Sequence, residues 1–132
     1  MRDRRSRVGL LLAAVAVCGA ARVQPGGIAA AQPGLWDVSH SATGAHAERV
    51  CVADPAVLAQ WENRASGCTR TLLGEQANQI TFDYRCAGGS FGRSAMTLLT
   101  PRTLRIETQG ISGGLPFDYV LHARRVGSCP HR

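Results

Sequence analysis

The sequence predicts a mainly β fold: a single antiparallel, curved sheet of about seven strands with one short helix, stapled by two disulfides. Three observations support this prediction. Apolar residues alternate with period two over much of the chain after residue 32, four cysteines lie in that part, and short connections separate the alternating segments. We expect residues 32–132 to form one domain.

The first 31 residues are predicted to be a signal peptide. Residues 1–7 carry four Arg and one Asp, and an uncharged, mainly apolar run of fourteen residues follows at 8–21, which is the layout of an export signal. Ala29-Ala30-Ala31 favours cleavage after Ala31, and residues 19–21 are the alternative site. We therefore expect a periplasmic or secreted protein with no stable membrane span after leader removal.

Two other interpretations of the leader fit less well. A retained anchor would need about 20 apolar residues, whereas Arg22 and Pro25-Gly26-Gly27 end the run early. Lipidation of Cys18 would need a small residue just before it, and Val17 occupies that position.

The first strand is predicted over residues 33–40, with Trp36 anchoring it in the core. Residues 48–52 form a short second strand that carries Cys51. A helix of about two turns is predicted over residues 54–61, because Asp54 suits the N-cap and Pro55 the first helical position. Its apolar residues then share one face: Val57, Leu58 and Trp61.

Residues 68–86 are predicted to form a β-hairpin, because both arms alternate with period two. We expect a three-residue loop, Gln76-Ala77-Asn78, with Asn78 in the left-handed conformation. This register sets three pairs opposite each other: Leu72 with Phe82, Arg70 with Tyr84 and Cys68 with Cys86.

The remaining chain is predicted to form three more strands. Residues 87–93 are rich in glycine and are interpreted as a hairpin loop, after which residues 94–100 form a strand. Residues 103–109 form the next strand, residues 110–116 a loop, and residues 117–126 the last strand.

The cysteines of the predicted domain number four, an even count in an exported chain, and this favours two disulfides. Three connectivities are possible. The hairpin register favours Cys68 with Cys86, which leaves Cys51 with Cys129. In the chain-entropy model, the disulfide that closes the short loop stabilises the domain by about 3 kcal/mol, and the disulfide that closes the long loop stabilises it by about 4 to 5 kcal/mol.

The charge of the chain argues against nucleic-acid binding. The formal net charge is +6, but the leader holds five Arg and one Asp, so the predicted domain has ten Arg against eight acidic residues, a net of +2. Nucleic-acid binding calls for a concentrated basic face with stacking aromatics. We expect no nucleic-acid partner.

Several short motifs together resemble the bacterial domain-of-unknown-function family 3617. They are Pro33-Gly34-Leu35-Trp36-Asp37-Val38, Cys51-Val52-Ala53-Asp54-Pro55-Ala56, Cys68, Tyr84-Arg85-Cys86 and Arg124-Arg125-Val126-Gly127-Ser128-Cys129-Pro130. The segment between His40 and Glu48 departs from the family, whose members tend to be longer and richer in proline there. The resemblance implies a small exported proteobacterial protein. It implies no activity and no catalytic residue.

Catalytic chemistry has one candidate in the sequence, Ser112 in Gly110-Ile111-Ser112-Gly113-Gly114. This segment matches the G-x-S-x-G pattern of hydrolases, in which the serine lies between a strand and a helix. A strand and not a helix is predicted after Ser112, so the structural context of a hydrolase serine is missing. A hydrolase that uses Ser112 is therefore only the alternative function.

Metal and cofactor binding are not expected. The histidines lack the i, i+4 spacing of a helical metal site, although His40 and His46 could form a weak surface site with Asp37 or Glu48. Five carboxylates, Asp37, Glu48, Asp83, Glu107 and Asp118, fall on the predicted solvent side of their strands.

The leading hypothesis for function is a non-catalytic exported domain that binds an envelope component, a partner protein or a small apolar ligand. It depends on the lack of a convergent polar site and on four aromatic residues predicted to share one sheet face: Phe82, Tyr84, Phe117 and Tyr119. Simple core packing of these rings is the favoured alternative to a ligand cavity.

Overall fold

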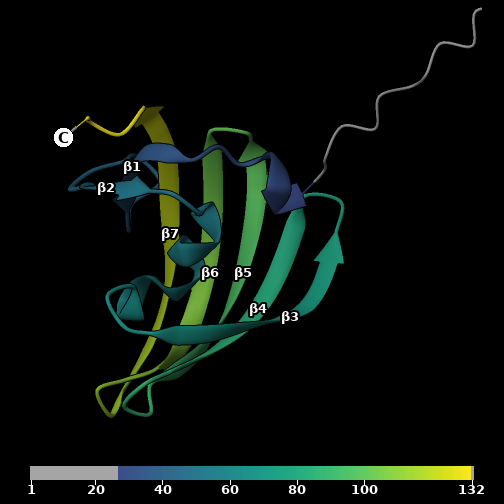
Figure 1. The fold of residues 1–132 in the computed structure, drawn as a ribbon, viewed down its shortest axis with the longest axis vertical. Coiled ribbons are helices and arrows are strands. Elements are labelled where there is room, and N and C mark those ends of the chain that lie inside the picture. Colours follow the sequence, from purple (N-terminus) through teal and green to yellow (C-terminus); the bar gives the residue numbers. More distant parts are fainter. Residues whose placement is uncertain (1–26, 132) are drawn as a thin grey trace, which may run out of the picture.

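The computed structural model describes residues 27–131, which form one open antiparallel sheet of seven strands. The spatial order of the strands is β2-β1-β7-β6-β5-β4-β3 (Figure 1). This confirms the predicted fold class. The predicted signal peptide lies outside the described residues as far as residue 26. The strands are β1 Gly34–Ser39, β2 Glu48–Val52, β3 Cys68–Gln76, β4 Gln79–Cys86, β5 Phe91–Thr100, β6 Thr103–Ser112 and β7 Leu115–Gly127.

The core lies on the inner side of the curved sheet, where η2 (Pro55–Asn63) packs against the strands (Figure 1). Every second residue of the central strands is buried there, as the period of two requires. The largest apolar side chains that are fully buried are Trp36, Tyr84, Leu58, Met96, Leu104, Ile106 and Leu121.

The predicted helix is present as a 3₁₀-helix that continues slightly beyond Trp61, to Asn63. Asp54 caps it as predicted, because its Oδ1 accepts a hydrogen bond of 3.0 Å from the Ala56 backbone N–H. Gln60 has non-helical angles (φ −108°, ψ 37°), so the helix consists of two short pieces joined by a kink. Leu58 and Trp61 are buried, as the spacing predicted.

The β3–β4 hairpin has the predicted register beside the cysteines, with Cys68 opposite Cys86 and Leu72 opposite Phe82. The predicted loop was wrong. Gln76 pairs with Gln79, so the loop has two residues, and Ala77 rather than Asn78 has the positive φ, 26°. A bulge between Leu72 and Gly74 absorbs the difference of one residue.

Two disulfides staple the sheet. Cys68–Cys86 joins β3 to β4, and Cys51–Cys129 joins β2 to the chain just after β7. The second bridge spans 78 residues. It therefore fixes the C-terminal segment to the beginning of the domain.

The two glycine-rich connections are shorter than predicted. Strand β5 already begins at Phe91, so residues 91–93 belong to the sheet. Strand β6 continues to Ser112 and β7 begins at Leu115, which leaves only Gly113 and Gly114 between them. Both glycines have positive φ angles, 57° and 80°, which suit a two-residue hairpin turn.

The N-terminal described segment, η1 (Gly27–Ala30), lies against the core: Ile28 and Ala30 pack on it, and Ala31 is buried. Cleavage after Ala31 would remove these contacts, whereas cleavage after residue 21 would keep them. The cleavage site stays a prediction. No helix within residues 27–131 is long and apolar enough to cross a membrane.

Candidate functional site

The four aromatic residues singled out in the sequence lie on the inner side of the sheet, where they form part of the packing. Tyr84 is fully buried, and Phe82, Phe117 and Tyr119 are half-buried. Because η2 occupies the inner side with Leu58 and Trp61, much of this face is filled core.

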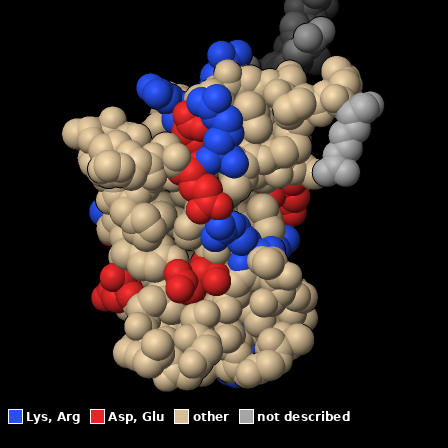
Figure 2. Space-filling model, turned by 90° about the vertical axis from the view of Figure 1, so that its left-hand side faces the viewer, with Lys and Arg blue, Asp and Glu red and all other residues tan. Residues whose placement is uncertain are grey.

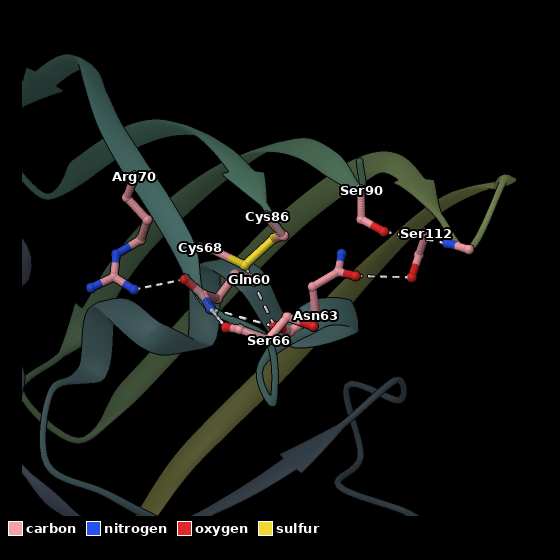
Figure 3. The surroundings of a disulfide bond; sticks show 9 residues. Gln60, Asn63, Ser66, Cys68, Arg70, Cys86, Ser90 and Ser112 are labelled. Carbon is pink, nitrogen blue, oxygen red and sulfur yellow. Dashed lines mark hydrogen bonds between the residues drawn. A yellow bond between two sulfur atoms is a disulfide. The ribbon is translucent and has the colours of Figure 1, made fainter. Parts of the chain in front are cut away.

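Polar side chains beside the Cys68–Cys86 disulfide connect η2 to the surrounding strands (Figure 3). Arg70 on β3 donates a hydrogen bond of 2.7 Å to the Gln60 side-chain oxygen. Ser112 at the end of β6 donates one of 3.0 Å to Asn63 Oδ1. These contacts hold the helix over the sheet, so their role is structural.

Two buried polar atoms on this inner side have no hydrogen-bond partner among the described residues: Asn63 Nδ2 and the Tyr84 hydroxyl oxygen. Burial raises the pKa of Tyr84 above its usual value. Burial also raises the pKa of Tyr119, whose hydroxyl donates a hydrogen bond of 2.6 Å to a Glu62 carboxylate oxygen, which favours the protonated phenol.

Ser112 does not have the surroundings of a catalytic nucleophile. It lies between two strands, before the Gly113-Gly114 turn, and not between a strand and a helix. Its hydroxyl is hydrogen-bonded to Asn63, a side-chain amide that does not act as a general base. Nothing in this geometry points to the hydrolase alternative.

Several of the histidines and carboxylates considered in the sequence analysis contact other side chains. His40 packs edge-on against Tyr119, with the ring centres 4.6 Å apart. Within residues 27–131 no three His, Cys, Asp or Glu side chains gather in a way that could hold a metal ion. Four of the five predicted surface carboxylates form ion pairs: Asp37 with Arg49, Glu48 with Arg64, Asp83 with Arg93 and Glu107 with Arg105.

A hollow of about 340 Å³ lies on the outer face of β4, β5 and β6. Arg85 and Phe91, which are opposite each other in the β4–β5 pair, line it together with Arg93 and Gln109. Arg93 is fixed by two hydrogen bonds to the Asp83 carboxylate, of 2.6 and 3.0 Å. These hydrogen bonds from Arg93 lower the pKa of Asp83, which keeps that carboxylate charged.

The turns β4–β5 and β6–β7 lie together at the lower end of the sheet (Figure 1), where the Gly113 backbone N–H donates to Ser90 Oγ at 3.3 Å. We call residues 86–92 and 110–117 the hairpin end. They include no charged residue. Figure 2 shows this lower end almost entirely without charged atoms, in contrast to the middle of the molecule.

Large apolar side chains are exposed at the hairpin end. Phe91 exposes 44% of its surface and Leu115 exposes 72%. Sequence reasoning missed Phe91 because residues 87–93 were assigned to a loop. One sequence signal could have placed Phe91 in a strand. Phe91 and Arg93, which are exposed, alternate with Gly92 and Ser94, which are buried, and this continues the period of two of β5.

Comparison with known proteins places this chain in a family. The family described as "Protein of unknown function (DUF3617)" matches residues 31–129. The chain belongs to this family. Neither the curated proteins nor the solved structures contain a match to this DUF3617 chain. Membership assigns no activity, so the function has to be argued from the surface of the molecule.

Proposed function

We propose that this DUF3617 chain is an exported, non-catalytic domain that binds a component of the cell envelope through its hairpin end. Two disulfides favour an oxidising compartment outside the cytoplasm. Arg70 and Ser112 near the inner face hydrogen-bond to side chains of η2. The large apolar side chains exposed at the hairpin end favour contact with a partner as the role of the domain.

The observation that carries this proposal is the exposure of Phe91 and Leu115 beside two adjacent turns that lack charge, with Phe91 on the outer face of the sheet and Leu115 on the inner face. Exposed large apolar residues that are grouped together and bordered by charged residues mark interaction surfaces. Arg85 and Arg93 supply such a border on the outer face.

The proposal is tested by sedimentation of the purified, processed protein with isolated cell envelopes. We expect the wild type to sediment with the envelopes and Phe91→Thr to remain largely in the supernatant. Leu99→Thr is the matched control, because Leu99 is also on β5, is 56% exposed and lies at the opposite end of the strand. Threonine maintains the strand preference in both variants.

Equal sedimentation of the three proteins would contradict the assignment of binding to the hairpin end. Absence of sedimentation by the wild type would contradict the envelope contact itself. Fluorescence of Trp36 and Trp61, which are both buried, checks that each variant is folded.

A further inference from the structure

A pocket of about 360 Å³ lies between the outer face of the sheet and the β1–β2 loop, residues 40–47. Its floor includes Asp37 of β1 and Arg124 of β7. These two residues alternate with the buried Trp36 and Ala123, so they face away from the core. The volume of this loop pocket is within the range of about 300–1,000 Å³ that is typical of small-molecule sites.

The loop that forms the wall of the pocket is fixed by Ser39, which is buried at the end of β1. The Ser39 hydroxyl donates a hydrogen bond of 2.6 Å to the Ala45 carbonyl and accepts one of 3.0 Å from the Ser41 N–H. The Gly44 N–H donates to the Ser41 carbonyl at 3.0 Å. These hydrogen bonds lie within the loop and its anchor, so the pocket is preformed and a ligand does not have to order it.

One row across the strands places a carboxylate between two arginines. Asp37 lies opposite Arg49 of β2 on one side and opposite Arg124 of β7 on the other. Arg49 donates two hydrogen bonds to the Asp37 carboxylate, of 2.7 and 3.0 Å. The hydrogen bonding from Arg49 lowers the pKa of Asp37, and the positive charges of Arg49 and Arg124 lower it further, so the carboxylate stays charged. The row therefore has one positive charge in excess.

The excess charge is assigned to Arg124, because none of the ion pairs among the described residues includes it. The next row across the floor holds His122, which lies opposite Arg105. Arg105 is itself paired with Glu107 at 2.8 Å. The neighbouring row thus leaves the charge of Arg124 without compensation at the pocket.

Uncharged donors lie beside Arg124 in the loop pocket. Thr103 is opposite Arg124 in the β6–β7 pair, and His122 is two residues before it on the same face of β7; both line the pocket. The Thr103 hydroxyl accepts a hydrogen bond of 3.1 Å from the Thr100 hydroxyl, so its own proton is available to a ligand.

We propose that the loop pocket binds a small organic carboxylate. The guanidinium of Arg124 supplies paired N–H donors that match the two oxygens of a carboxylate, and Thr103 and His122 add donors beside it. A single uncompensated positive charge favours a monoanion over a doubly charged phosphate. Ala42 and Ala47 in the wall are small and apolar, which leaves room for the organic part of the ligand.

The test is an NMR titration of the isotope-labelled, processed protein with benzoate. Benzyl alcohol is the probe with the same ring and no charge, and inorganic phosphate is the probe with charge and no ring. We expect benzoate to shift the backbone N–H signals of residues 42–47 and 122–124 and to leave those of the hairpin end unchanged. Benzyl alcohol and phosphate should each bind at least about tenfold more weakly than benzoate.

Arg124→Gln should weaken the binding of benzoate at least about tenfold, because it removes the charged pair of donors. Arg102→Gln is the matched control: Arg102 is also exposed and is next to Thr103 in the chain, but it does not line the pocket. It should change the affinity less than about twofold, since exposed charges outside the site are screened. The N–H signals of the central strands check that both variants are folded.

Four results would overturn this inference: no shift with benzoate, equal binding of benzyl alcohol, binding of phosphate as tight as that of benzoate, or equal loss of affinity in the two arginine variants. None of them bears on the proposed envelope contact, because Thr103 begins β6 at the pocket and the hairpin end lies at the other end of that strand. Sedimentation with envelopes tests that contact separately.

Discussion

At the scale of single residues, Tyr84 requires a glycine at position 92 of the neighbouring strand β5. A Cβ atom at Gly92 would lie 2.5 Å from the Tyr84 hydroxyl oxygen and 2.8 Å from the Gln109 carbonyl oxygen. The glycine therefore makes room for a buried ring beside the hairpin end. The need for space beside Tyr84 explains why glycine is found within strand β5 here, although the composition of residues 87–93 suggested a loop.

Gly92→Ala should destabilise the protein by about 1–3 kcal/mol, because the added methyl group overpacks a fixed site. Gly74→Ala is the control: it is also within a strand, and nothing lies within 4 Å of its added Cβ. We expect that variant to change the free energy of unfolding by less than about 1 kcal/mol. Urea unfolding measures both, and equal effects would argue against the role of Tyr84.

Two phenols, that of the buried Tyr84 and that of the half-buried Tyr119, predict a loss of stability at alkaline pH. In the folded state the pKa values of Tyr84 and Tyr119 are raised above the usual value of about 10. The folded state thus keeps these protons when the unfolded state begins to release them. The resulting stability is complete below about pH 10 and is lost as the pH rises toward the folded-state pKa values.

The measurement is the free energy of unfolding in urea between about pH 8 and pH 11. The wild type should lose stability more steeply over the upper part of this range than Tyr119→Phe, which lacks one of the two phenols. Parallel pH profiles would show that Tyr119 has an ordinary pKa in the folded protein.

At the scale of elements, alternation predicted the strands well where they carry apolar side chains. The register of Cys68 with Cys86 was correct because both thiols and apolar residues had to align. The loop length was wrong because a bulge at Leu73 has no clear signal in the sequence. The strand ends at Phe91 and Leu115 were missed because glycines adjoin them in the chain.

The helix shows the same limit. The capping by Asp54 and the buried face of Leu58 and Trp61 were predicted from residue type and spacing. The 3₁₀ geometry and the kink at Gln60 were not, because they follow from tertiary contacts of Gln60 with the segment after the helix and with Arg70. The sequence analysis missed part of the candidate site for a related reason. The residues beside Phe91 on the outer face can be identified only when the register of the strands is known.

At the scale of the whole molecule, the two disulfides constrain loops of very different length, with sequence separations of 18 and 78. Replacing Cys51 and Cys129 by alanine should lower the free energy of unfolding by about 4 to 5 kcal/mol, and replacing Cys68 and Cys86 by about 3 kcal/mol. Urea unfolding of the two double variants provides the comparison. A larger loss from the shorter loop would contradict this ranking.

The molecule as a whole combines a filled inner face, which is suited to stability, with an uncharged apolar end that is open to a partner. The central claim is that contact with the envelope occurs at this end. The most direct test compares Phe91→Thr with Leu99→Thr for binding to isolated envelopes. The account predicts that only Phe91→Thr loses binding, and loss in both variants or in neither would contradict it.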